Sequence, residues 1–223
     1  MELSDRALQV LRNFSGINGN IFIEEGNVVR TVSESRTVLA KSTLDVEFPT
    51  SFGIYDLPEF LSVLNLVDSP ALTFDDKYVE LSGSAGRSKV KYFYSDPSTL
   101  TTVNKDLALP SEDAWFMLDA ATFAKIKSAA AALGHSEVNV TIDNGVITLT
   151  TKDNDDDTSN AFAIVVEGDS TSESLKAVFN INNLKMIENG DYRVSLSSKY
   201  ISHFVNTESN SEYWVALQKS SQF

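Results

Sequence analysis

The strongest constraint on the fold is an order of helix-like and strand-like patterns that occurs twice along the chain. Apolar spacing predicts a helix over 4–14, strands over 21–24, 28–32, 37–41 and 44–48, a second helix after Asp56, and three strands between 71 and 94. Further on, it predicts a strand over 115–118, a helix over 120–133, four strands between 138 and 181, a helix over 183–187 and three last strands. We therefore expect an α+β fold in which one unit of helices and antiparallel strands is used twice.

The helix boundaries support this reading. Ser4, Asp56 and Asp119 stand where an oxygen side chain would cap the first turn of a helix, and Gly134 follows the alanine-rich helix. The stretches 52–57 and 179–184 resemble each other, because each runs a strand into an Asx-capped helix headed by Leu. These two helix starts are the clearest sign of an internal repeat.

An irregular stretch separates the two predicted units. Residues 96–110 lose periodicity and contain Pro97 and Pro110, with Ser and Thr between them. We expect an N-terminal domain over 1–95, a connector over 96–110, and a C-terminal domain over 111–223.

The residues that usually carry chemistry are scarce. The chain has no cysteine and only two histidines, His135 and His203, neither in a metal-binding or catalytic spacing. Asp153, Asp155 and Asp157 have the spacing that opens a calcium loop, but Thr158 stands where that loop needs Gly, so a solvated loop is expected. We predict no catalytic residue, no metal and no cofactor, and hence a protein that is not an enzyme.

No stretch approaches the ~20 apolar residues that would span a bilayer, and the first residues lack a signal-peptide pattern. A cytoplasmic protein without membrane contact is therefore expected. The formal net charge of −13 ordinarily argues against tight binding to nucleic acid, so any DNA-binding reading must account for it.

Segments spread over nearly the whole chain resemble one family, the DNA polymerase sliding clamps of T-even-like bacteriophages. The resembling residues, in order, are Leu3, Ser4, 11–14, Ile17, Asn18, 54–57, Phe60, Leu61, Leu64, Arg87, Ser88, 96–99, Asn104, Lys105, 179–182, Lys185, Met186, 190–192, Tyr213, 215–217 and Phe223. Residues 84–86 and 153–160 match the family poorly. The resemblance implies a homotrimer of two-domain protomers, closed head to tail, with helices around a central hole.

The resemblance also implies partners. These are double-stranded DNA held without sequence preference, the C-terminal peptide of a DNA polymerase, and an ATP-dependent clamp loader in the cytoplasm of the infected cell. The predicted helices carry a net charge of +3, which leaves −16 for the rest of the chain. We expect the helix cations to face DNA, and these are Arg6, Arg12, Lys125, Lys127 and Lys185.

Ring closure needs unpaired sheet edges at both ends of the protomer. The candidate edges are 89–94 and 161–166, and the interface residues we expect there are Lys89, Tyr92, Phe93, Phe162 and Ile164. The alternative is that both strands lie inside their own sheets. For the wall of the polymerase-peptide pocket the candidates are Val103, Leu107, Leu109 and Trp214, although such residues also serve as plain packing.

Two other classes of protein fit the composition. A virion structural ring or tube protein would also be β-rich, acidic and free of cysteine, and so would a β-rich ligand-binding module. Loading onto DNA separates a clamp from both.

Overall fold

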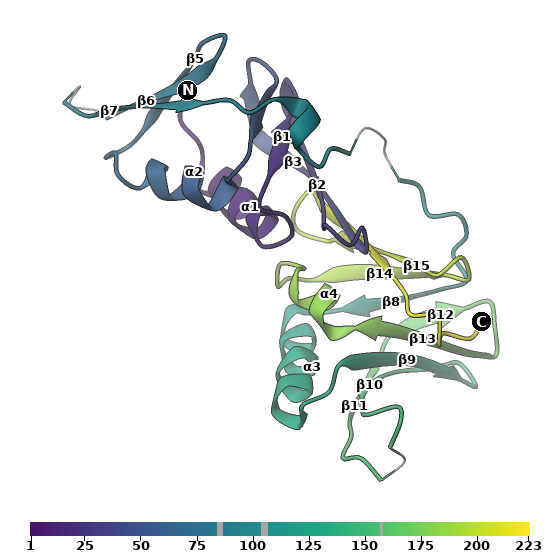
Figure 1. Cartoon of the computed structure of the whole chain (residues 1–223). Helices are drawn as coiled ribbons and strands as arrows, with labels where there is room; N and C mark the ends of the chain where they lie inside the picture. The colour runs from purple at the N-terminus through teal and green to yellow at the C-terminus, as the bar shows by residue number, and fades with distance from the viewer. Residues whose placement is uncertain (84–86, 104–106, 157) are drawn as a thin grey trace. The chain divides into compact units, whose positions relative to one another are not determined.

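A computed structural model describes residues 1–83, 87–103, 107–156 and 158–223 of the chain. The chain divides into two compact units, 1–105 and 106–223 (Figure 1). This division falls within the stretch 96–110 that the sequence predicts as the connector. Residues 104–106 lie outside the described part, so the bounds of that connector stay a prediction.

The first unit begins with a helix and ends in a small sheet. Its elements are α1 (Asp5–Ser15), β1 (Ile21–Ile23), β2 (Gly26–Val32), β3 (Val38–Phe48), β4 (Phe52–Ile54), α2 (Leu57–Leu64), β5 (Ala71–Phe74), β6 (Tyr78–Ser82), β7 (Lys89–Phe93) and the 3-10 helix Pro97–Thr99. β1 pairs with β4, β2 with β3, and β5, β6 and β7 form a sheet in that order, all antiparallel.

The second unit has the same kinds of element. They are β8 (Ala114–Leu118), α3 (Ala120–Leu133), β9 (Glu137–Asp143), β10 (Val146–Thr151), β11 (Phe162–Val166), β12 (Gly168–Ser170), β13 (Ser174–Asn180), α4 (Ile181–Lys185), β14 (Tyr192–Ser197), β15 (Ile201–Asn206) and β16 (Ser211–Ala216). One antiparallel sheet has the order β11-β10-β9-β13, and another runs β12-β8-β14-β15-β16.

Capping fixes where the helices begin. The side chains of Ser4, Asp56 and Asp119 accept hydrogen bonds from the backbone N–H of Ala7, Glu59 and Thr122, as a cap does for the first turn of a helix. α3 ends at Gly134, whose φ of 73° belongs to the left-handed region. These four boundaries are the ones that the sequence predicts.

Each unit has its own core between helices and sheet. In the first, α1 packs on α2 and on β3, and Leu11, Phe14 and Phe60 are fully buried there. In the second, α3 packs on β9, β10, β11 and α4, and the ring of Phe123 lies 6.0 Å from that of Tyr192. Burial of these large side chains is the main source of stability in each unit.

Three predictions about elements are wrong. The strands predicted over 37–41 and 44–48 are one strand, β3, because Ser42 is buried and continues the alternation. The short helix is not 183–187 but α4, since Asn180 rather than Asn183 is its cap, with the Asn180 side chain accepting from Asn182 N–H. The sequence pattern does not predict β12, because its residues Gly, Asp and Ser have low strand propensity.

Candidate functional site

The two strands predicted to join copies of the chain are both edge strands. β7 ends the sheet β5-β6-β7, and β11 ends the sheet β11-β10-β9-β13. The alternative that they lie inside their own sheets is therefore wrong for the part of the chain that the structure describes. An edge strand presents a row of N–H and C=O groups to any other strand that comes alongside.

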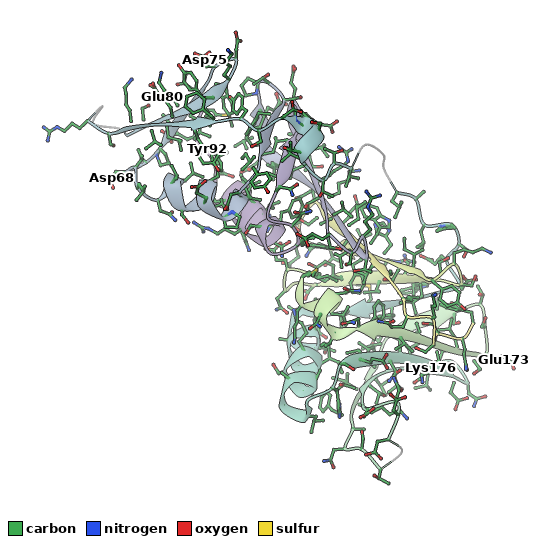
Figure 2. All side chains as sticks on the ribbon, in the orientation of Figure 1. Asp68, Asp75, Glu80, Tyr92, Glu173 and Lys176 are labelled. Carbon is green, nitrogen blue, oxygen red and sulfur yellow. The ribbon has the colours of Figure 1, made fainter. Side chains whose placement is uncertain are left out.

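The side chains of β7 alternate between two environments. Val90 and Tyr92 lie opposite the buried residues of β6 and face the side of α2, whereas Phe93 is 64% exposed on the other face. The Tyr92 ring makes a T-shaped contact with Phe60 at 5.1 Å between centroids, and its hydroxyl lies 3.0 Å from a carboxylate oxygen of Glu59. Burial, followed by that hydrogen bond, raises the pKa of Tyr92. Tyr92 thus anchors β7 to α2, and Figure 2 labels it near Glu80 of the neighbouring strand.

The side chains of β11 also alternate between a half-buried face and an exposed face. Phe162, Ile164 and Val166 are half-buried opposite Thr151, Leu149 and Ile147 of β10, which are buried on the α3 side. On the other face Val165 is 65% exposed. The predicted interface residues therefore lie on two edge strands that both alternate between half-buried and exposed side chains. Among these residues, Tyr92, Phe162 and Ile164 face the helices.

The far edges of the same two sheets are occupied by other parts of the chain. Met1 exchanges backbone hydrogen bonds of 2.7 and 2.6 Å with Leu72 of β5. Along β13, Lys176 exchanges backbone hydrogen bonds with Gln222, and Gln218 N–H donates to the carbonyl of Val178. The outer backbone edges of β5 and β13 are thus hydrogen-bonded to other parts of the chain, whereas no described residue lies along the outer edge of β7 or β11.

The predicted DNA-facing cations all lie on helices, but in different settings. Arg12 on α1, Lys125 on α3 and Lys185 on α4 are exposed, whereas Arg6 is half-buried. Residues two apart on a helix point about 200° from each other, so Lys125 and Lys127 do not share a face.

Lys127 is packed rather than solvated. Its ammonium nitrogen lies 3.8 Å from the centre of the Phe123 ring, and burial lowers its pKa. The remaining exposed surface of α3 is made largely of small uncharged side chains, which are Ala121, Ala124, Ser128, Ala131 and Ala132. α3 therefore presents Lys125 as its main exposed charge.

The four residues predicted for a partner pocket belong to both units. Val103 is in the first unit, where it lines a small pocket with Phe22 and Arg30. Leu107, Leu109 and Trp214 belong to the second unit, and Leu107 is 39% exposed. Trp214 is only 4% exposed, so the side chain of Leu107 is far more accessible than the indole of Trp214.

A polar and aromatic cluster lies around Trp214 and was not anticipated from the sequence. His203 stacks on Trp214 at 4.4 Å and pairs with Glu212 at 2.9 Å, and burial lowers its pKa. On the same face of the sheet Arg193 forms a bidentate pair with Glu112 at 2.6 and 2.8 Å. Glu112 precedes β8, and the pairing of β8 with β14 brings it beside Arg193, which lies 81 positions away in the chain.

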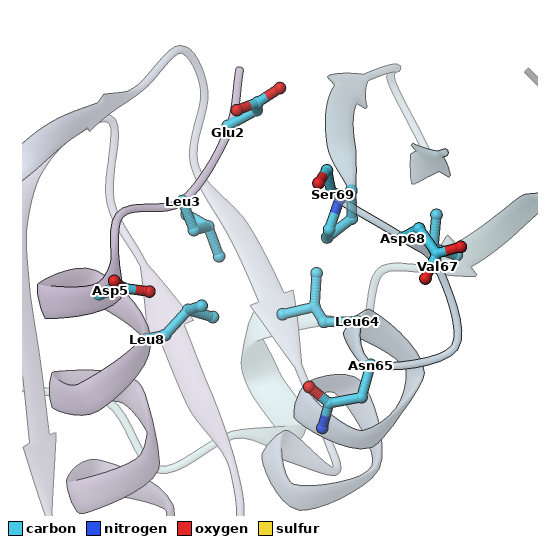
Figure 3. A pocket seen from close by; sticks show the side chains of 10 residues that line it. Glu2, Leu3, Asp5, Leu8, Leu64, Asn65, Val67, Asp68 and Ser69 are labelled. Carbon is cyan, nitrogen blue, oxygen red and sulfur yellow. The ribbon is translucent and has the colours of Figure 1, made fainter. Parts of the chain in front are cut away.

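A pocket of about 420 Å³ lies between the start of α1 and the end of α2. Figure 3 shows Leu3, Leu8 and Leu64 turned toward its centre, with acidic side chains near its rim. Its mixture of carboxylates and aliphatic groups matches no predicted site.

Among the described residues no group of three or more His, Cys, Asp or Glu side chains could hold a metal ion. Asp157 of the calcium-like spacing lies outside the described residues. Asp153 accepts a hydrogen bond from Asp155 N–H, as in an ordinary polar loop. His135 pairs with Thr151 at 3.0 Å. No helix within the described ranges is long and apolar enough to cross a membrane.

Two family models match the chain and together cover most of it. Residues 5–102 match the model described as DNA polymerase processivity factor, and residues 116–219 match the model described as gp45 sliding clamp, C terminal.

Curated relatives agree with these models. The sliding clamp of Vibrio phage KVP40 is 31% identical over 223 residues, which cover 98% of this chain and 99% of that protein. The sliding clamp of Enterobacteria phage T4 is 25% identical over 225 residues, which cover 99% and 98% of the two chains.

Solved structures show the same fold at lower identity. PCNA from A. fulgidus, determined with the C-terminal region of FEN-1 bound, has a TM-score of 0.72 and 17% identity, with 99% and 98% of the two chains covered. PCNA from Entamoeba histolytica has a TM-score of 0.70 and 17% identity, with 95% and 94% covered.

Proposed function

Because this chain belongs to the phage sliding-clamp family of DNA polymerase processivity factors, we propose that three copies close into a ring around double-stranded DNA. The ring holds the replicative polymerase on its template, and an ATP-dependent loader places it there. The protein carries out no catalytic step of its own.

The observation that carries this proposal is the pair of open edges, β7 in one unit and β11 in the other. Different edges of one chain make a head-to-tail contact, and such contacts generate a closed ring when the rotation per copy returns to its start. Two units of one kind per chain, taken three times, supply six similar segments for that ring.

The charge distribution suits a ring that slides. The helices carry five cationic side chains and two acidic ones, Asp5 and Glu59, so their net charge is +3 within a chain of −13. Helices that line the hole attract phosphates weakly and without reading sequence. Retention is then topological, while the strongly acidic remainder keeps other DNA away from the outer surface.

We also propose that a C-terminal peptide of the polymerase docks beside the connector, with Leu107 as an exposed contact. Leu107→Ser should weaken binding of such a peptide about tenfold, measured by fluorescence anisotropy. Lys219→Ser, a change at another exposed position of the same unit, serves as the control. Equal affinity of all three proteins for the peptide would remove Leu107 from the site.

A topological experiment tests the ring. The protein is incubated with linear duplex DNA, both ends are then blocked with bulky protein caps, and the DNA is washed at high salt. The protein should stay on capped DNA and leave when a restriction enzyme cuts it, because a closed ring escapes only over a free end. DNA capped before incubation is the control, and it should retain nothing without a loader. Loss of the protein in the wash, whether or not the ends are capped, would reject the encircling ring.

A further inference from the structure

We propose that copies of this chain join by one antiparallel pairing in a single register, with Tyr92 of β7 opposite Ile164 of the next copy and Lys89 opposite its Glu167. The inference rests on the ring proposed above and specifies which residues of two copies meet.

The first step is to find which residues of β7 direct their backbone toward the open edge. Tyr94 N–H donates to the carbonyl of Lys77 at 3.0 Å, and Gly83 N–H donates to that of Ser88 at 3.1 Å. Both pairs continue the register of β6 with β7, in which Val90 lies opposite Leu81. Hydrogen-bonded pairs alternate along an antiparallel ladder, so Val90 and Tyr92 bond to β6. Lys89, Lys91 and Phe93 therefore direct their N–H and C=O groups outward.

The same reasoning applies to β11, starting from the covered edge of its sheet. Lys176 exchanges backbone hydrogen bonds with Gln222, so its polar groups point away from β9. Alternation through the registers of β13, β9 and β10 then directs Ile164 toward β10. Ala163 and Val165 consequently direct their N–H and C=O groups to the open edge. The carbonyl of Glu167, which accepts from Met117 N–H, also points away from β10.

The two edges match in a second respect. On both strands the residues with outward backbone groups carry their side chains on the face away from the helices. Residues directly opposed in an antiparallel pair have their side chains on the same face of the sheet. The pairing therefore makes β5-β6-β7 continuous with the next copy's β11-β10-β9-β13 and keeps α2 and α3 on one side. Only registers that differ by two residues remain, in which Tyr92 faces Phe162, Ile164 or Val166.

The exposed side chains select one of these three. With Val166 opposite Tyr92, only two residues of each strand overlap. With Phe162 opposite, Phe93 falls beyond the first residue of β11 and Lys89 lies against Val165. With Ile164 opposite, Phe93 lies across Ala163 and diagonal to Val165, so that the two exposed apolar side chains, 64% and 65%, cover each other.

Charge favours the same register. Lys89 is exposed at the start of β7, where it pairs with Glu80 at 2.7 Å, and Glu167 is exposed just after β11. Opposite charges that face each other across two strands stabilise a sheet. With Ile164 opposite Tyr92, the ammonium of Lys89 meets the carboxylate of Glu167 in the next copy.

Engineered cysteines test the register cleanly, because the chain contains none. Val90 and Val166 would form a pair without mutual backbone hydrogen bonds, whose Cα atoms lie about 4.5 Å apart, within the range for a disulfide. Val90→Cys with Val166→Cys should therefore give covalent trimers on a non-reducing gel after mild oxidation. Val90→Cys with Ile164→Cys and Tyr92→Cys with Val166→Cys report the registers shifted by two residues either way, and each should cross-link at least tenfold more slowly.

Sedimentation of the reduced proteins separates the two proposals. Trimers that cross-link fastest through one of the shifted pairs would overturn the register while leaving the ring intact. If the parent chain and all the reduced variants sediment as monomers, the ring and the register are both rejected. Covalent dimers without trimers would point to a two-fold contact and would also overturn the proposal.

A charge exchange provides a test without cysteines. Glu167→Lys should weaken trimer association about two- to fivefold per joint at low salt, and adding Lys89→Glu should restore it. Glu173→Lys, the same change at an exposed position away from β11, is the control and should have no effect. Failure of the double variant to recover would contradict the Lys89–Glu167 pairing.

Discussion

Replacing Lys91 by proline should open the ring without unfolding the protomer. The backbone of Lys91 points away from β6, so the N–H that proline lacks is not used inside the chain. In the proposed joint this N–H bonds to the carbonyl of Val165 in the next copy. Lys91→Ala removes the side chain, which bonds to the Tyr78 hydroxyl at 3.1 Å, but keeps the N–H. It is therefore the matched control.

The expected magnitude follows from the lost hydrogen bond. A backbone hydrogen bond contributes about 1 kcal/mol net, and a carbonyl left unpaired in the joint costs about as much again. The loss is thus about 2 kcal/mol per joint and about 6 kcal/mol for three joints. Since 1.4 kcal/mol corresponds to a factor of ten, the association constant of the trimer should fall about 10⁴-fold.

Analytical ultracentrifugation over a range of protein concentrations measures this change directly. Lys91→Pro should sediment as a monomer where the parent chain and Lys91→Ala sediment as trimers. Thermal unfolding of Lys91→Pro should remain cooperative, which shows that the sheet β5-β6-β7 persists. A trimer that tolerates proline at this position, or one that Lys91→Ala disrupts equally, would refute the assignment of this backbone to the joint.

Three further outcomes are expected. Hydrogen bonds from Arg193, the largest cause, lower the pKa of Glu112 to about 2, so its contribution is complete above pH 4.5 and lost as the pH falls toward 2. After allowance for its 40% exposure, Glu112→Gln should cost about 1 kcal/mol in urea unfolding at pH 7 and almost nothing near pH 2. Gly168→Ala should destabilise the second unit by about 2 kcal/mol, because the new Cβ would lie 2.1 Å from the carbonyl oxygen of Trp115. An unchanged thermal unfolding temperature would contradict this packing. Replacement of Arg12, Lys125 and Lys185 by Glu should reduce processive synthesis severalfold in primer extension while the trimer persists. Replacement of the exposed Lys199 and Lys219 by Glu is the control and should not reduce it. Equal effects of the two sets would count against DNA-facing helices.

The sequence predicts local structure well wherever one side chain decides a boundary. Asp119 and Gly134 delimit α3 because capping depends on neighbouring residues alone. Asn144 and Gly145 have φ of 49° and 79° in the turn that joins β9 to β10, and Asn-Gly is the residue pair that such a two-residue turn prefers. The split of β3 fails because the polar Ser42 resembles a break, although its burial depends on what packs against it.

Long-range pairing is what the sequence alone does not supply. Whether β7 or β11 lies at an edge depends on partners distant in the chain, and so does the burial of Trp214. Lys127 is a different case, because the Phe123 ring on which its ammonium packs lies only four residues earlier on α3, so this contact is local. The bidentate pair of Glu112 with Arg193 has no local signal at all.

The strand-like cover on β5 and β13, provided by Met1 and by Gln218 and Gln222, has a consequence for how copies accumulate. A sheet with two bare sides would let chains add without limit, as happens in fibrils. Here each of these two sheets has one open edge, β7 or β11, so a linear assembly of copies has one open β7 at one end and one open β11 at the other. Once these two ends meet, nothing in these sheets remains to recruit another molecule, and the size of the assembly is fixed by curvature alone.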